Sequence, residues 1–117
     1  MKILFLDDRP QEIKRLWANA GCQHHELLPV EKFESVESTL TRIELEKPDI
    51  IFIGYGLGHL DITGKDVVIA IREKGFQGLI IANSGGTLEQ FAGVEVDGEV
   101  KRNPAILCQL IDRLSNQ

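Results

Sequence analysis

The sequence has few cysteines, few aromatic residues, no excess of basic charge and no long apolar run. Two cysteines among 117 residues, Cys22 and Cys108, are too few for a disulfide scaffold, so we expect reduced thiols in a cytoplasmic protein. The net charge of −5 argues against a nucleic-acid backbone as the main partner, since phosphate binding requires a basic stripe. No apolar run approaches the roughly 20 residues that span a bilayer, and the sequence starts without a signal-peptide pattern. We therefore expect neither nucleic acid nor membrane as a partner.

The composition that is present is typical of one globular domain. Hydrophobic residues make up 43% of the chain and charged residues 26%, which is enough to form a core and a charged surface. The length is close to the commonest domain size, so we expect a single domain over residues 1–117.

Short apolar runs alternate with helical periodicity along the chain. Pro10 is placed to begin a helix, Thr63 with Asp66 forms a predicted capping box, and Asn103 precedes a last helix. A short fourth helix is expected at 87–91. We predict strands at residues 2–6, 26–30, 50–53 and 79–82, and an irregular fifth strand at 94–100 that is interrupted at Asp97-Gly98. This alternation indicates an α/β fold, a flavodoxin-like doubly wound parallel sheet with strand order 2-1-3-4-5 and about five helices.

Chemically active residue types follow the predicted strands. Asp7 and Asp8 follow the first, Ser84 follows the fourth and Lys101 follows the fifth, whereas the third strand is followed by Gly54. Ligands of such sheets sit at the carboxyl ends of the strands. Paired carboxylates suit a divalent cation, and a hydroxyl with an ammonium suits a phosphoryl group. The carboxylate that would serve as nucleophile is missing.

These residues resemble the receiver domain of two-component response regulators over essentially the whole chain. That family has an acidic pair after the first strand, a phosphoacceptor aspartate after the third, Ser or Thr after the fourth and Lys after the fifth. The resemblance places the acceptor position at Gly54, within the stretch Gly-Tyr-Gly-Leu-Gly. It also places Gly98 where receivers carry an aromatic switch residue.

The resemblance, with these two departures, predicts an atypical receiver that keeps the fold and has lost the phosphorelay chemistry. Asp7, Asp8, Gly54, Ser84 and Lys101 then form a vestigial phosphorylation pocket without a catalytic residue. Asp8 and Asp7 would bind Mg²⁺ weakly at most, and no cofactor is required. The expected activity is binding to a histidine kinase or an output protein, as a monomer or weak homodimer.

Other interpretations of the acidic pair stay open. Asp7 and Asp8 also suit a turn and helix cap before Pro10, and Asp8 also suits a structural ion pair with Lys101. A small Mg²⁺-dependent phosphotransfer enzyme or phosphatase with Asp7 or Asp8 as nucleophile is one alternative function. Binding of a small anion beside Lys101, in the space that Gly54 leaves, is another.

The remaining candidates have simpler structural explanations. His59 and Asp61 could substitute in the pocket, but a solvated loop is the stronger expectation. His24 and His25 would point to opposite faces of a strand, which argues against a metal pair. Trp17 lies on the apolar stripe of its predicted helix, so we expect it in the core.

Overall fold

The computed structural model describes residues 2–7, 9–19, 25–30, 32–58, 61–83, 96–100, 109 and 112–113. The expected helix at 87–91 lies outside this part, and of the last helix only residues 109, 112 and 113 are described, all helical. None of the helices in the described part is long and apolar enough to cross a membrane. The elements are β1 (Lys2–Leu6), α1 (Pro10–Asn19), β2 (Glu26–Pro29), α2 (Val36–Glu46), β3 (Ile50–Ile53), α3 (Gly64–Glu73), β4 (Leu79–Asn83) and β5 (Gly98–Val100).

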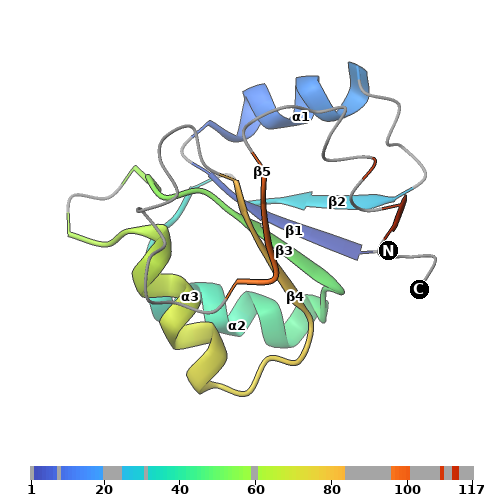
Figure 1. The fold of residues 1–117 in the computed structure, drawn as a ribbon. Helices are drawn as coiled ribbons and strands as arrows, with labels where there is room; N and C mark the ends of the chain where they lie inside the picture. Colours follow the sequence, from blue (N-terminus) through green and yellow to red (C-terminus); the bar gives the residue numbers. More distant parts are fainter. Residues whose placement is uncertain are drawn as a thin grey trace.

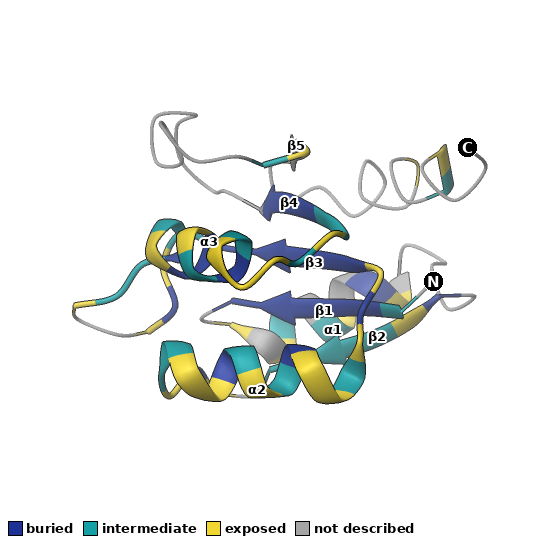
Figure 2. Cartoon of the chain, turned by 90° about the horizontal axis from the view of Figure 1, so that it is seen from below, coloured by how far each residue is buried: buried dark blue, intermediate teal, exposed yellow. Residues whose placement is uncertain are grey.

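The five strands form one parallel sheet in the order β2-β1-β3-β4-β5, which confirms the predicted doubly wound fold. Helices α2 and α3 cover one face of the sheet and α1 covers the other (Figures 1 and 2). The winding of the chain changes direction between β1 and β3. Their carboxyl ends therefore lie at the switch point, where such sheets bind ligands.

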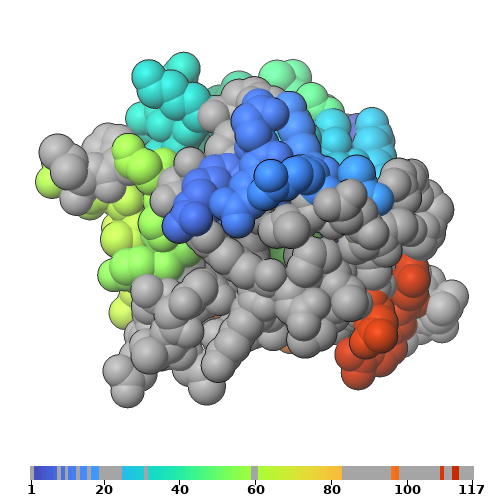
Figure 3. Space-filling model, turned by 90° about the horizontal axis from the view of Figure 1, so that it is seen from above, coloured from blue at the N-terminus to red at the C-terminus, as the bar shows by residue number. Residues whose placement is uncertain are grey.

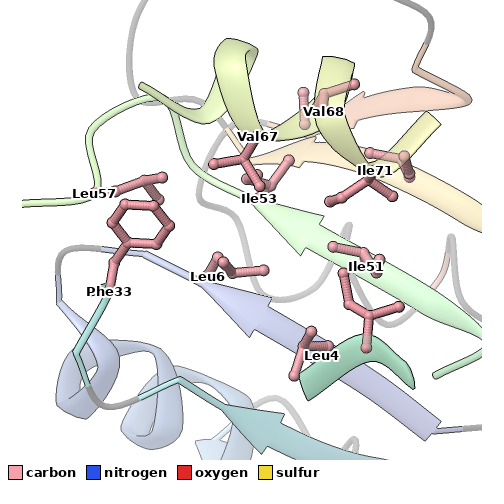
Figure 4. Close-up of a cluster of buried hydrophobic side chains, with 12 residues drawn as sticks. Leu4, Leu6, Phe33, Ile51, Ile53, Leu57, Val67, Val68 and Ile71 are labelled. Carbon is pink, nitrogen blue, oxygen red and sulfur yellow. The ribbon is translucent and has the colours of Figure 1, made fainter. Parts of the chain in front are cut away.

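The core under α2 and α3 is aliphatic. Alternate residues of β1 and β3 point to this face, as the pleat requires, and meet the apolar stripe of α3 (Figure 4). Phe33 and Leu57 close the core near the carboxyl ends of the strands. The β1, β3 and α3 members of this cluster are Leu4, Leu6, Ile51, Ile53, Val67, Val68 and Ile71.

The core under α1 is aromatic. Phe5 of β1 stacks on Phe52 of β3 with ring centroids 4.9 Å apart, and Trp17 of α1 meets Phe5 edge to face at 6.0 Å. Trp17 is buried, so its predicted place in the core is confirmed. Figure 3 shows this side of the molecule, with α1 in blue across it. The aromatic contacts fix α1 over β1 and β3, and so fix the turn that joins β1 to α1.

Local hydrogen bonds set the ends of α2 and α3. The Ser35 hydroxyl accepts from the N–H of Ser38 at 3.0 Å, and the Ser38 hydroxyl accepts from the N–H of Ser35 at 3.2 Å. In the predicted capping box of α3, the Asp66 carboxylate accepts from the N–H of Thr63 at 2.9 Å. Helix α2 ends at Lys47, whose φ of 49° breaks the helix just before Pro48. The start of α3 could be predicted because its capping box depends on neighbouring residues alone.

Strand β5 begins at Gly98, and residues 96 and 97 before it are outside a strand, so the predicted interruption of the fifth strand falls at Asp97 and not at Gly98. Residues 94 and 95 of the predicted strand lie outside the described residues. The N–H of Asp97 donates to the carbonyl oxygen of Ile80 at 2.7 Å, and the Asp97 carboxylate accepts from the N–H of Ile80 at 2.8 Å. The same carboxylate is 2.7 Å from the Arg72 guanidinium of α3. Asp97 is therefore an anchor between α3 and β4 from which β5 begins.

Candidate functional site

Asp7 and Gly54 lie next to each other at the carboxyl edge of the sheet. Leu6 is level with Ile53 in the parallel register of β1 and β3. The ladder continues one step further, because the N–H of Gly54 donates to the carbonyl oxygen of Leu6 at 2.8 Å. The Gly54 backbone therefore lies directly beside the end of β1, while the membership of Asp7 and Gly54 in one pocket stays a prediction.

Asp7 is a buried carboxylate that also shapes the chain around it. Asp7 is only 5% exposed, and its side-chain Oδ1 accepts a hydrogen bond from the N–H of Arg9 at 3.0 Å. This bond closes a turn that leads into α1, as the alternative interpretation of the acidic pair expects. Arg9 itself pairs with Glu12 at 3.4 Å on the first turn of the helix. Asp7 is thus held in place by local structure, whatever chemistry it takes part in.

Gly54 is buried where the resemblance expects a phosphoacceptor. Glycine supplies no oxygen to attack a phosphorus atom and no side-chain ligand for a metal. The loop that follows is tied back onto the start of α3: Gly56 bridges Thr63, and the N–H of Gly64 donates to the carbonyl oxygen of Tyr55 at 2.7 Å. Gly58, with φ of 73°, takes a conformation that favours glycine.

The other predicted pocket residues, Asp8, Ser84 and Lys101, lie outside the described residues, as does His59. The strands that precede Ser84 and Lys101 are described. Strand β4 ends at Asn83 and β5 ends at Val100, and these two residues pair with each other. Asp61 is exposed on the loop before α3, as expected. The composition of the vestigial pocket stays a prediction.

Gly98 occupies the sheet position expected for the aromatic switch residue. It pairs with Ile81, which pairs with Phe52, which pairs with Phe5. Residues level with one another in a parallel sheet share a face. Gly98 ends this row of large side chains at β5. It has no side chain that could change orientation as an aromatic switch residue does.

The described residues do not supply the ligands of a Mg²⁺ site at this edge. Mg²⁺ prefers several oxygen ligands, commonly including carboxylates. Asp7 offers one carboxylate, and one of its oxygens already accepts from Arg9. Within the described ranges, no group of three or more His, Cys, Asp or Glu side chains is arranged to hold a metal ion.

Sequence reasoning missed two polar contacts between distant segments. His25, which is buried just before β2, has its Nε2 3.0 Å from Oδ1 of Asp112 in the last helix. Arg72 joins α3 to Asp97 before β5, as described above. Periodicity does not reveal such contacts, because the partners are 87 and 25 residues apart.

Comparison with known proteins gives a sequence likeness that covers part of each relative. No family model matches the chain. The chain is 34% identical over 89 residues to the N-acetylglucosaminyldiphosphoundecaprenol N-acetyl-beta-D-mannosaminyltransferase of Staphylococcus aureus strain MRSA252. It is 33% identical over the same length to the enzyme of strain NCTC 8325 / PS 47. The match covers 76% of this chain and 30% of the enzyme, so the chain spans less than a third of the length of these relatives.

Solved structures resemble the chain over nearly its whole length. The receiver domain of the Francisella response regulator 1452 has a TM-score of 0.78 at 15% identity, over 98% of this chain and 96% of that one. The response regulator TrrA from Thermotoga maritima, in complex with Mg²⁺-BeF, has a TM-score of 0.76 at 20% identity, over 97% of both chains. A LuxR-family DNA-binding response regulator from Staphylococcus aureus has a TM-score of 0.77 at 16% identity, over 98% of both. The chain therefore has the receiver-domain fold of response regulators.

Proposed function

We propose that this chain is a receiver-like signalling module that works by binding a protein partner without being phosphorylated itself. The observation that carries the proposal is a buried glycine, Gly54, beside Asp7 at the switch point of a receiver fold. The partner is a histidine kinase or an output protein of a two-component-type pathway in the cytoplasm. The chain acts as a monomer or weak homodimer.

The chemistry of phosphoryl transfer supports this choice. An acyl phosphate forms when a carboxylate oxygen attacks phosphorus and the leaving group departs with its electron pair. Gly54 has no such oxygen. Asp7 is a poor substitute nucleophile, because it is 5% exposed and one of its oxygens accepts from Arg9. The same burial argues against the alternative of a phosphatase that uses Asp7.

Treatment with acetyl phosphate and Mg²⁺ tests the proposal. Intact-mass measurement is expected to show no added phosphoryl group on the natural chain. The variant Gly54→Asp, which restores a carboxylate at the acceptor position, is treated in the same way. An added phosphoryl group on this variant would show that Asp7, Asp8, Ser84 and Lys101 still form a working pocket. A stable acid-resistant, hydroxylamine-sensitive phosphoryl adduct on the natural chain would refute the proposal.

Partner binding gives a second readout. The affinity for the dimerisation domain of a candidate histidine kinase is expected to be the same with and without acetyl phosphate. A receiver that depends on phosphorylation would instead change its affinity, because its two states bind the partner differently. A phosphate-dependent change in affinity would contradict the proposal even if the adduct were too short-lived to isolate.

The curated relatives favour one second candidate, a role in glycosyl transfer. Identity to these enzymes is 34%, whereas identity to the receiver structures named above is 15–20%. Since the match covers 30% of the enzyme, the shared part would be one unit of it. Transfer of an N-acetylmannosaminyl group to an N-acetylglucosaminyl-diphospholipid by the purified chain would favour this candidate, and no transfer would leave the signalling role.

A further inference from the structure

An apolar groove lies between α2 and α3, toward the ends where these helices lead into β3 and β4. We name it the α2–α3 groove. Its volume is about 150 Å³, and both helices with the turns after them, residues 36–47 and 64–78, are described without a gap. Figure 2 shows the two helices side by side on this face of the sheet. The groove is lined by Leu40, Ile43, Glu44, Ile71, Lys74, Gly75 and Phe76.

The lining of the groove is mostly hydrocarbon. Ile43 and Ile71 are buried members of the core, and they form its floor. Leu40 and Phe76 are half-buried and keep part of their apolar surface open to solvent. An enclosed apolar cavity of about 150 Å³ accepts a group as large as benzene. The α2–α3 groove therefore has room for one aliphatic side chain.

Leu45 is an exposed apolar side chain on the helix that forms one wall of the groove. It is 77% exposed, and it directly follows Glu44, which lines the groove. It lies roughly half a turn round the helix from buried Ile43, so it points to solvent and does not fill the groove of its own chain. One face of the molecule therefore carries both an apolar projection and an apolar groove.

Opposite charges lie on the two walls of the groove. Glu44 of α2 and Lys74 at the end of α3 are both exposed. Neither of them forms an ion pair within the described part of the chain. A two-fold axis that brings Glu44 of one copy to Lys74 of a second copy also brings Lys74 of the first copy to Glu44 of the second. The two walls are therefore complementary in charge to a second copy of themselves.

We propose that the α2–α3 groove binds a second copy of this chain about a two-fold axis. Leu45 of each copy enters the groove of the other, and Glu44 pairs with Lys74 in both directions. One leucine from each copy and two exposed ion pairs make a small interface, so we expect a weak dimer with a dissociation constant of about 0.1 to 1 mM.

The groove lies far from the switch point of the sheet. Helices α2 and α3 lead into the amino ends of β3 and β4, whereas Gly54 follows the carboxyl end of β3. The dimer therefore goes beyond the proposed signalling function and does not require it. A failure to dimerise would leave that function as it stands.

Sedimentation velocity over a range of protein concentrations measures dimer formation. Leu45→Gln is expected to weaken dimerisation by about a hundredfold, because the two-fold axis removes the apolar contact twice. Ile69→Gln is the matched control, since Ile69 of α3 is 42% exposed and does not line the groove. This control should leave the dissociation constant within about twofold of the natural value. Fluorescence of buried Trp17 shows whether each variant is folded.

Charge reversal tests the two-fold pairing directly. Glu44→Lys places like charges at both contacts of a homodimer, and Lys74→Glu does the same, so each variant alone should dimerise about tenfold more weakly. An equimolar mixture of the two variants has opposite charges at both contacts, so it should form a heterodimer about as stable as the natural dimer. Lys65→Glu makes the same change of charge at the other end of α3 and should alter nothing.

Three results would overturn the proposal. A natural chain that stays monomeric at about 2 mM would leave the groove to a different partner. A dimer that Leu45→Gln does not weaken would use another surface. A mixture of Glu44→Lys and Lys74→Glu that dimerises no better than either variant alone would show that these two residues do not meet across the interface.

Discussion

The anchor formed by Asp97 provides a quantitative test of how β5 is held. In Asp97→Ala the N–H of Ile80 loses its 2.8 Å acceptor and the Arg72 guanidinium loses its 2.7 Å partner. The first loss costs about 1 kcal/mol, as a typical hydrogen bond does. The Arg72 and Asp97 side chains are 22% and 36% exposed, so solvent screens the pair and limits the second loss to about 1 kcal/mol. We expect the free energy of unfolding to fall by about 2 kcal/mol in total.

Urea unfolding followed by tryptophan fluorescence measures this change. Trp17 is the only tryptophan, and it is buried against Phe5, so its emission reports loss of the core. Asp97→Asn should lose about half as much stability, because an amide oxygen still accepts one hydrogen bond. Glu73→Ala, an exposed acid on α3, is the control and should stay within about 0.5 kcal/mol of the natural chain.

A double-mutant cycle isolates the contact between α3 and the segment before β5. Arg72 also donates hydrogen bonds to the carbonyl oxygens of Phe76 and Gly78, at 3.1 Å each. Arg72→Met alone should therefore lower the free energy of unfolding by more than loss of the ion pair with Asp97 would. The coupling energy between Arg72→Met and Asp97→Asn should be about 0.5 to 1 kcal/mol. A coupling of zero, together with an unchanged stability of Asp97→Ala, would refute the account of Asp97 as an anchor.

Three further substitutions test packing, backbone strain and a distant contact. In Gly78→Ala the new Cβ would come within 2.8 Å of the Asp49 carbonyl oxygen, and we expect a loss of about 1 to 3 kcal/mol in urea unfolding. Gly75→Ala meets no atom within 4 Å but has φ of 88°, so its loss should be near 1 kcal/mol and come from backbone strain alone. Asp112→Ala removes the 3.0 Å contact to buried His25 and should cost about 1 kcal/mol, whereas no change would mean that this contact contributes nothing to holding the last helix.

Much of the fold could be predicted because its signals are local. The run at Ile50–Ile53 is apolar on both faces, and it forms the buried central strand β3 as expected. Thr63 and Asp66 cap α3 because they are three residues apart, a spacing that is visible in the sequence. Of the candidate site, the structure places the Gly54 backbone beside Leu6 at the end of β1, while the pocket of Asp7, Asp8, Gly54, Ser84 and Lys101 stays a prediction.

The omissions arise where distant segments meet. The anchoring role of Asp97 was not predicted, since nothing near it in the sequence shows that its carboxylate binds Ile80 and Arg72. The contact of His25 with Asp112 was missed for the same reason.

By itself the sequence determined the alternation of strands and helices and the absence of a carboxylate at position 54, because side-chain type and spacing are properties of the chain alone. The tertiary structure decided that the Gly54 backbone lies beside Leu6 at the end of β1 and that Asp97 anchors β5. Each of these depends on strand register and helix docking, which arise from the packing of the whole core and not from any one segment.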